Sequence, residues 1–271
     1  VGSEMCIRDR STLLNIIGGL DTPSAGKCLV AGYDLAQFSE ADRTDYRRFV
    51  VGHVWQQSGR NLLPDATLAA NVELPLTLGG TGPRARARQA RELLGLVGLA
   101  DLAERLPGQL SGGQQQRGAI AVALANEPTL FLADEPTGEL DSTTTHEIIS
   151  LLSALNQQLK ITMVLVTHDS AIASQVDRTI AIRDGRTSTE TIRRVTPHEE
   201  LAAGVLPESA VIGLSAQTHY ESLILDRVGR VQLPKEALER IPYHGRIEAR
   251  IFGDHVELWP VRTSTNGASA T

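Results

Sequence analysis

The sequence has little cysteine, no long apolar run and no excess of positive charge. Its two cysteines, Cys6 and Cys28, are too few for a disulfide framework, so we expect a reducing compartment. No run approaches the roughly 18 consecutive apolar residues of a membrane-spanning helix. The longest candidate, which starts at Ala119, is interrupted by Asn, Glu and Pro at 126–128. Any work at a membrane is therefore expected of a peripheral protein.

Acidic residues outnumber basic ones. Lys and Arg total 26 and Asp and Glu total 32, which gives a net charge of −6. A mildly acidic chain does not capture nucleic acid or anionic lipid through charge alone, so no nucleic-acid partner is expected. The first residues, VGSEMCIRDRS, lack the apolar stretch of about 7–15 residues that marks a secretory signal. These features predict a cytoplasmic protein.

Hydrophobic residues make up 41% of the chain, which is enough to bury a sizeable core. Over residues 11–186, short β-rich runs alternate with longer runs whose apolar residues recur every three or four positions. This alternation predicts an α/β domain. The remainder predicts a linker over 187–217, a small β-rich module over 218–262 and a disordered tail over 263–271.

The strongest local signal is the segment Leu110-Ser111-Gly112-Gly113-Gln114, which precedes an alanine-rich run. Ser111 and the two glycines begin a helix, where unpaired backbone N–H groups and the helix dipole bind anions. Glycine lets the backbone approach a phosphate closely, and the serine hydroxyl adds a donor. The alternative is a glycine-containing loop before a buried helix.

A second signal is an apolar run that ends in Asp134 and Glu135. Both carboxylates are then expected at the carboxyl edge of a buried strand, where ligands bind in open α/β sheets. Asp134 is placed to hold Mg²⁺, which prefers oxygen ligands. Glu135 is suited to polarising a water for attack on a γ-phosphate. The alternative is a solvated acidic turn.

Two further polar side chains follow apolar strands. His168 ends the run LVTHD, where it can reach a γ-phosphate beside Glu135. Gln56 ends the run VVGHVW with an amide that is able to bind a metal ion or a water.

Together these residues resemble the nucleotide-binding subunit of an ATP-binding cassette (ABC) transporter. The segment LSGGQ at 110–114 is similar to the family signature, and LFLADE at 130–135 is similar to Walker B. Gln56 resembles the Q-loop glutamine, GELD at 138–141 the D-loop, and His168 the switch histidine. The resemblance covers residues 11–186. It implies the P-loop NTPase fold with a helical subdomain at about 57–130 that docks the membrane partner.

The resemblance also implies an enzyme that hydrolyses ATP with Mg²⁺. Its catalytic residues would be Glu135 and His168, and its metal ligands Ser11, Gln56 and Asp134. Nucleotide contacts would come from Ser11, Thr12, Gln56, Ser111, Gly112, Gly113, Gln114 and Asp141.

Two such subunits close face to face in this family, and the signature of one completes the ATP site of the other. The implied partners are therefore a second copy of the chain and an integral membrane permease, with the chain on the inner face of the cell membrane. The segments STLLNIIGGLDTPSAGK, GYDL and NVELPL resemble the branch that serves lipoprotein-release and macrolide-export permeases.

The chain departs from the family at the phosphate-binding loop, which reads G-x-x-x-x-G-K-[ST]. The expected helix begins at Ser11, but alignment backwards puts Glu4 and Asp9 at the required glycines and Arg10 at the lysine. Either the protein is a degenerate ABC protein, or residues 1–10 are a non-native junction. We favour the junction because the match resumes abruptly and in register at Ser11. As written, the chain is expected to hydrolyse ATP poorly.

The C-terminal module has a resemblance of its own. DRVGRVQLPKE at 226–236 and the later hairpin GRIEARIFGDHVELW resemble the swapped-hairpin domain of AbrB-like regulators. Residues 219–262 contain seven Lys or Arg and seven Asp or Glu, so the module lacks the basic footprint of a DNA-binding domain. We predict a dimerisation or regulatory role.

One alternative function remains, namely a soluble or degenerate ABC ATPase with a regulatory or DNA-associated role. Only 53 residues separate Gln56 from Leu110, which leaves no room for the long coiled coil of DNA-repair members. Ribosome-acting members carry two cassettes, and this chain has one. Both observations favour the transporter subunit.

Overall fold

The structure is a computed structural model that describes residues 2–56, 61–169, 172, 175–183, 186–193, 219–223, 247–252 and 256–260. The chain divides into two compact units, Val1–Asp177 and Arg178–Thr271. Among the described residues, no helix combines the length and the apolar character that crossing a bilayer requires.

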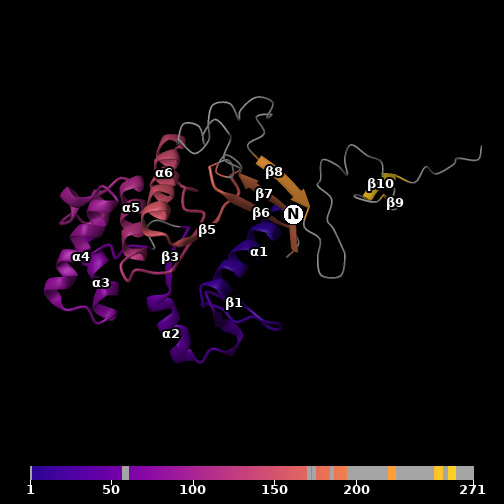
Figure 1. Cartoon of the computed structure of the whole chain (residues 1–271). Coiled ribbons are helices and arrows are strands. Elements are labelled where there is room, and N and C mark those ends of the chain that lie inside the picture. The colour runs from indigo at the N-terminus through magenta and orange to yellow at the C-terminus, as the bar shows by residue number, and fades with distance from the viewer. Residues whose placement is uncertain are drawn as a thin grey trace, which may run out of the picture. The chain divides into compact units, whose positions relative to one another are not determined.

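The first unit contains a parallel sheet with the strand order β3–β4–β5 (Figure 1). These strands are Val51–Val54, Leu130–Asp134 and Thr162–Val166. The central strand β4 is buried from Leu130 to Ala133. A parallel strand that is covered on both faces has a continuous apolar sequence, as LFLA does here. The carboxyl ends of all three strands lie at one edge of the sheet, so the residues that follow them are brought together.

The elements at the beginning of the chain pack against this sheet through a small hydrophobic core. Its elements are α1 (Gly2–Ile17), the hairpin of β1 (Leu29–Val30) and β2 (Tyr33–Asp34), the 3₁₀ turn η1 (Leu35–Gln37) and α2 (Glu40–Phe49). Their buried side chains pack against β3 and β4 in one cluster, formed by Leu14, Leu35, Tyr46, Val51, Leu130 and Leu132.

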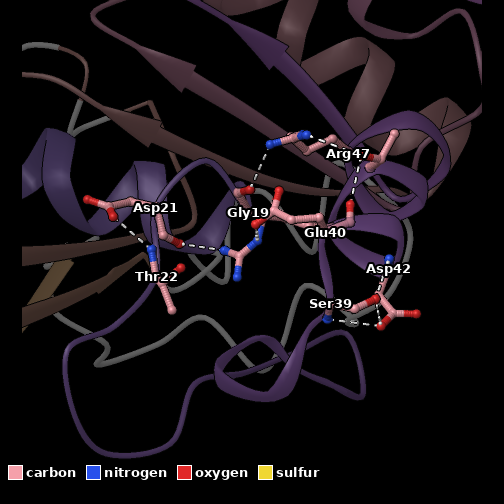
Figure 2. Close-up of polar contacts among 9 residues, drawn as sticks. Gly19, Asp21, Thr22, Ser39, Glu40, Asp42 and Arg47 are labelled. Carbon is pink, nitrogen blue, oxygen red and sulfur yellow. Dashed lines mark hydrogen bonds and ion pairs between the residues drawn. The ribbon is translucent and has the colours of Figure 1, made fainter.

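Side chains of α2 bind carbonyls at the end of α1 and in the turn that follows it, and Figure 2 shows the bonds to Gly19 and Asp21. The Tyr46 hydroxyl donates to the Ile17 carbonyl at 2.8 Å, and Arg47 donates to the Gly19 carbonyl at 3.3 Å. Gly19 has φ +68°, and a Cβ there would lie 2.9 Å from the Tyr46 ring. Glycine therefore permits both the turn and the close approach of α2. The α2 helix itself begins with a capping box between Ser39 and Asp42.

A second, larger core lies among the helices that follow β3. These are α3 (Leu68–Leu78), α4 (Pro83–Leu96), the turns η3 (Ala100–Leu102) and η4 (Pro107–Gln109), α5 (Gly112–Ala123) and α6 (Ser142–Leu159). Helices α3, α4 and α5 contact one another, and the helical subdomain expected at about 57–130 stays a prediction. The α5 and α6 helices also supply buried residues to the same core, such as Ile120 and Leu152.

The predicted helix start at Ser11 is wrong, because α1 already begins at Gly2 and Ser11 lies in its interior. Residues 3–10 contain neither glycine nor proline. Without glycine the chain has no residue suited to a tight phosphate-binding turn, and without proline nothing stops the helix from extending backwards.

The second unit contains an antiparallel sheet with the order β6–β7–β8, formed by Arg178–Arg183, Arg186–Arg193 and His219–Leu223. The sequence predicts a linker from residue 187, but residues 187–193 belong to β7. The segment RTSTETIR is rich in β-branched threonine and isoleucine, which favour strands. Because its threonines are polar, it lacks the apolar run that marks the parallel strands. Because β6 pairs with β7 rather than with the parallel sheet, the first unit ends at Asp177 instead of 186.

The hairpin predicted near the C-terminus is present as β9 (Ile247–Ile251) and β10 (Val256–Pro260), which pair antiparallel. Its turn at 253–255, the rest of the linker at 194–217, the GRVQLPKE segment and the tail at 263–271 lie outside the described residues.

Candidate functional site

Asp134 is the last residue of β4 and lies beside α1. Its Oδ2 accepts a hydrogen bond from Ser11 Oγ at 2.9 Å. Burial raises the pKa of the Asp134 carboxyl, the bond from Ser11 opposes this rise, and the charge of Glu135 adds to it. A hydroxyl and a carboxylate thus converge at the carboxyl edge of the sheet.

Glu135 follows directly and combines burial with an unusual backbone. It is 4% exposed, and its φ is +46°. Its amide donates to the Val166 carbonyl at 2.8 Å, which fixes it against the end of β5. Residues with a side chain seldom adopt a left-handed backbone, and such strained residues cluster at functional sites.

His168 lies against this carboxylate. Its Nδ1 is 2.8 Å from Glu135 Oε1, and its side chain is 65% exposed. The imidazole therefore stands between the buried carboxylate and solvent. The structure brings together the two residues that the sequence predicts to be catalytic, while the catalytic roles remain predictions.

Arg10 makes a contact that sequence reasoning did not find. Its Nη1 donates to the Thr167 carbonyl at 3.1 Å, across 157 residues of chain. Thr167 immediately precedes His168, so Arg10 ties α1 to the end of β5. Nothing in the local sequence signals a contact of this range.

The position of Ser11 inside α1 changes what its backbone can bind. Amides in a helix interior donate to the carbonyl four residues earlier. The Ser11 and Thr12 amides are therefore engaged within the helix rather than free to hold an anion. The Ser11 hydroxyl reaches the site, whereas the residues aligned with the phosphate-binding loop, Glu4 to Arg10, continue the helix.

Gln56 lies exposed two residues beyond the end of β3. Val54 pairs with Ala133 in the sheet, so Gln56 follows at the same edge as Asp134 and Glu135. The neighbouring Trp55 is held by Asn61, whose amide group both accepts from the Trp55 amide at 2.8 Å and donates to its carbonyl at 3.0 Å.

The predicted helix start at Ser111 is present. Ser111 is the N-cap of α5: its Oγ accepts from the Gln114 amide, and Gln114 Oε1 accepts from the Ser111 amide. Gly112 and Gly113 form the first helical residues. The Gln115 amide group donates to the Pro107 and Leu110 carbonyls, which holds the chain leading into the helix.

Asp141 caps α6. Its carboxylate accepts from the Thr144 amide at 3.0 Å and from Thr144 Oγ1 at 2.7 Å. The backbone and side-chain bonds from Thr144 lower the pKa of Asp141. The predicted contact of Asp141 with nucleotide stays a prediction. Thr144 was missed in the sequence, although a threonine three residues after a capping aspartate is its signal.

The site thus divides into two groups of residues within the described part of the chain. Ser11, Asp134, Glu135 and His168 are linked through the edge of the sheet. Among the described residues, no hydrogen bond joins that group to the segment from Ser111 to Gln114. No cluster of three or more His, Cys, Asp or Glu side chains suited to a metal ion is found among the described residues.

Comparison with known proteins finds relatives of one family. Residues 10–138 match the family model described as ABC transporter. An uncharacterized ABC transporter ATP-binding protein of Thermotoga maritima is 46% identical over 177 residues, which cover 65% of this chain and 74% of that protein. The macrolide export ATP-binding/permease protein MacB of Brucella melitensis is 41% identical over 201 residues, 71% of this chain and 31% of that protein.

Solved structures of ATP-binding cassettes also match this chain. A dimeric ATP-binding cassette in a post-hydrolysis state, bound to ADP and phosphate, matches with a TM-score of 0.62 and 42% identity. The match covers 69% of this chain and 81% of that one. The chain therefore belongs to the ABC transporter family, as an ATP-binding cassette with the P-loop NTPase fold of the family's ATPases.

Proposed function

We propose that the chain is the ATP-hydrolysing subunit of a transporter and drives an integral membrane permease of the lipoprotein-release or macrolide-export type. The Brucella relative supports this proposal, because its name joins an ATP-binding part and a permease in one protein. In this proposal the cassette works as a peripheral protein on the cytoplasmic face of the membrane.

The observation that carries the proposal is the group formed by Ser11, Asp134, Glu135 and His168. Glu135 would orient a water and accept its proton, since its buried carboxylate lies at the sheet edge with His168 Nδ1 at 2.8 Å. His168 would steady that carboxylate and contact the γ-phosphate from the solvent side. The strained backbone at Glu135 holds the carboxylate in a fixed direction.

The donors at this edge fit Mg²⁺. Ser11 Oγ and the Asp134 carboxylate supply oxygen ligands, which are the kind that magnesium prefers while it keeps several waters. Gln56 would add an amide oxygen from the end of β3. Bound there, the ion would neutralise charge on the triphosphate.

The residues before Ser11 do not fit a triphosphate. A phosphate-binding loop offers free amides from a glycine-rich turn, whereas residues 2–10 are helical and Arg10 is turned to the Thr167 carbonyl. We therefore propose that this chain hydrolyses ATP weakly because its phosphate cradle is missing, while its remaining site residues are in place.

A homodimer would complete the site. The capping box of α5 uses the Ser111 and Gln114 amides and leaves those of Gly112 and Gly113 for a phosphate. Within the described part of the chain, no hydrogen bond links this turn to the Glu135 group of its own chain. A second copy would supply that turn, as the dimeric solved cassettes suggest.

Replacement of residues 1–10 by a strand and a glycine-rich turn ending in Gly-Lys before Ser11 tests this proposal. Measured as phosphate release from Mg-ATP, activity is expected to rise by roughly 100-fold or more, because several phosphate donors return at once. Glu135→Gln in the repaired chain should reduce turnover by roughly 100-fold or more and leave an ATP-bound dimer.

The matched control for that experiment is Glu104→Gln, which changes an exposed carboxylate outside the site and should leave turnover within about twofold. A repaired chain that fails to bind ATP would refute the proposed function and favour the alternative, a soluble ABC protein with a regulatory role.

For the C-terminal module we propose an AbrB-like dimerisation role. The β9–β10 hairpin supports it, together with the balanced charge of residues 219–262.

A further inference from the structure

The first turns of α5 and α6 pack closely against each other. A Cβ built on Gly112 would lie 3.4 Å from Leu140 Cδ2, which is an ordinary contact. A Cβ built on Gly113 would lie 2.5 Å from Thr144 Cγ2, which is closer than real Cβ atoms come. Gly113 therefore lacks a side chain because the Thr144 methyl occupies that space.

The Thr144 methyl has little freedom to move away. Thr144 Oγ1 donates to Asp141 Oδ2 at 2.7 Å, and the Thr144 amide donates to Asp141 Oδ1 at 3.0 Å. A β-branched side chain in a helix also has few rotamers. Rotation that relieved a clash with α5 would break the hydroxyl bond to Asp141.

The same two helices meet again one turn later. Arg117 of α5 forms an ion pair with Glu147 of α6. Arg117 lies four residues after Gly113, and Glu147 lies three residues after Thr144. Each pair therefore falls on one face of its helix. The ion pair is partly exposed and contributes little by itself, which leaves the Thr144 contact as the main steric constraint.

We propose that Thr144 is a positioning residue that joins the signature turn to the D-loop. Its hydroxyl donates a hydrogen bond to Asp141, and its methyl packs against Gly113. The signature turn and the D-loop therefore keep a fixed position relative to each other and move together. The importance of this for ATP hydrolysis rests on the proposed dimer, in which both segments would face the partner's nucleotide. The contact itself exists within one chain.

A double-mutant cycle on the nucleotide-free full chain tests the contact. Gly113→Ala should lower Tm by roughly 3–8 °C, since overpacking is costly in a chain of this size. Thr144→Ser removes the methyl and keeps the hydroxyl, so Gly113→Ala in that background should lose less than half as much. Gly112→Ala is the matched control, and its Tm should change by no more than about 2 °C.

NMR titration of the Asp141 carboxyl tests the other half of the link. Thr144→Val removes the hydroxyl and keeps a methyl toward Gly113, so the pKa of Asp141 should rise toward its ordinary value. Thr144→Ser should leave that pKa low, and Thr143→Val on the same helix turn should leave it unchanged.

Two results would overturn the proposal. One is an equal loss of Tm from Gly113→Ala in the wild-type and Thr144→Ser backgrounds. The other is an Asp141 pKa that Thr144→Val does not move. Neither readout involves nucleotide, so a chain that fails to bind ATP would count against the proposed function and leave this inference standing.

Discussion

His53 on β3 is a partly buried imidazole whose Nε2 atom is buried. Its Nε2 has no hydrogen-bond partner, and its ring lies 3.9 Å from the Trp55 ring, centroid to centroid. Burial lowers the pKa of His53 from 6.5 to about 4, because a charged ring would lose its hydration. The folded protein therefore keeps this ring neutral at pH values where an unfolded chain protonates it.

This difference in the pKa of His53 between the folded and unfolded chain predicts that acid lowers the stability of the fold. Between pH 6.5 and about 4 the unfolded chain binds a proton at His53 that the folded chain does not. Stability from this residue is complete above pH 6.5 and is lost as pH falls toward 4, by up to about 3 kcal/mol. Urea unfolding at pH 7.5, 5.5 and 4.5 measures it.

His53→Leu should flatten that pH profile, whereas His146→Leu, at an exposed position on α6, should not. An unchanged slope in His53→Leu would exclude His53 as the cause.

The site residues could be predicted from sequence to the extent that they end apolar strands. Asp134, Glu135 and His168 lie at the ends of β4 and β5, because parallel strands place their carboxyl ends together, and their roles stay predictions. The contacts of Arg10 and Thr144 were not found. They depend on the distance between helices and strands that are far apart in sequence, and no local pattern encodes this distance.

At the scale of elements, α1 is held at its C-terminal end by three side chains of α2. Arg43 donates to the Asp21 carbonyl at 3.2 Å, next to the Tyr46 and Arg47 bonds already described. Donors and cations suit this end of a helix, where carbonyls are unpaired and the dipole is negative. Because α1 carries Ser11 toward β4, this attachment also sets the position of the site's hydroxyl.

Removing one of these bonds should be measurable. Tyr46→Phe keeps the ring and loses the hydroxyl that donates to Ile17, so the free energy of unfolding should fall by about 1 kcal/mol. Tyr33→Phe, in the same aromatic cluster but 45% exposed, is the matched control and should change it by less than about 0.5 kcal/mol. Equal losses in both variants in urea unfolding would contradict the assigned role.

The start of a helix could be predicted where a capping residue marks it. Ser111 marks the start of α5 because serine and glutamine form a capping box. The start of α1 was misplaced because the family pattern expects a turn where this sequence lacks glycine. The sequence predicts a linker over 187–217, whereas residues 187–193 belong to β7, because their threonines favour extended backbone.

At the scale of the whole molecule, the proposed permease needs a docking surface on the helical subdomain. Leu74 and Leu78 of α3 are 42% and 60% exposed, and we propose that they form part of this surface. Tagged full-length chain purified from its native membranes is expected to recover an integral membrane permease, and Leu78→Asp should reduce that recovery about tenfold or more.

Leu159→Asp is the control for this experiment, because Leu159 is 37% exposed at the end of α6 and lies outside the helical subdomain. Recovery of DNA or ribosomes without a permease would contradict the transporter role. An equal loss in the two variants would exclude Leu78 as part of the docking surface.

The sequence predicts a β-rich module over 218–262, and the described residues of that range include the strands β8, β9 and β10. Its resemblance to AbrB-like domains stays a prediction, since the GRVQLPKE segment on which it depends lies outside the described residues.

The left-handed backbone of Glu135 lowers the stability of the folded protein. Glycine adopts φ near +46° freely, so a glutamate there carries strain of about 1 kcal/mol or more in every molecule, whether or not substrate is bound. In the proposed mechanism, this strain is the folding cost of holding the carboxylate at the edge of the sheet.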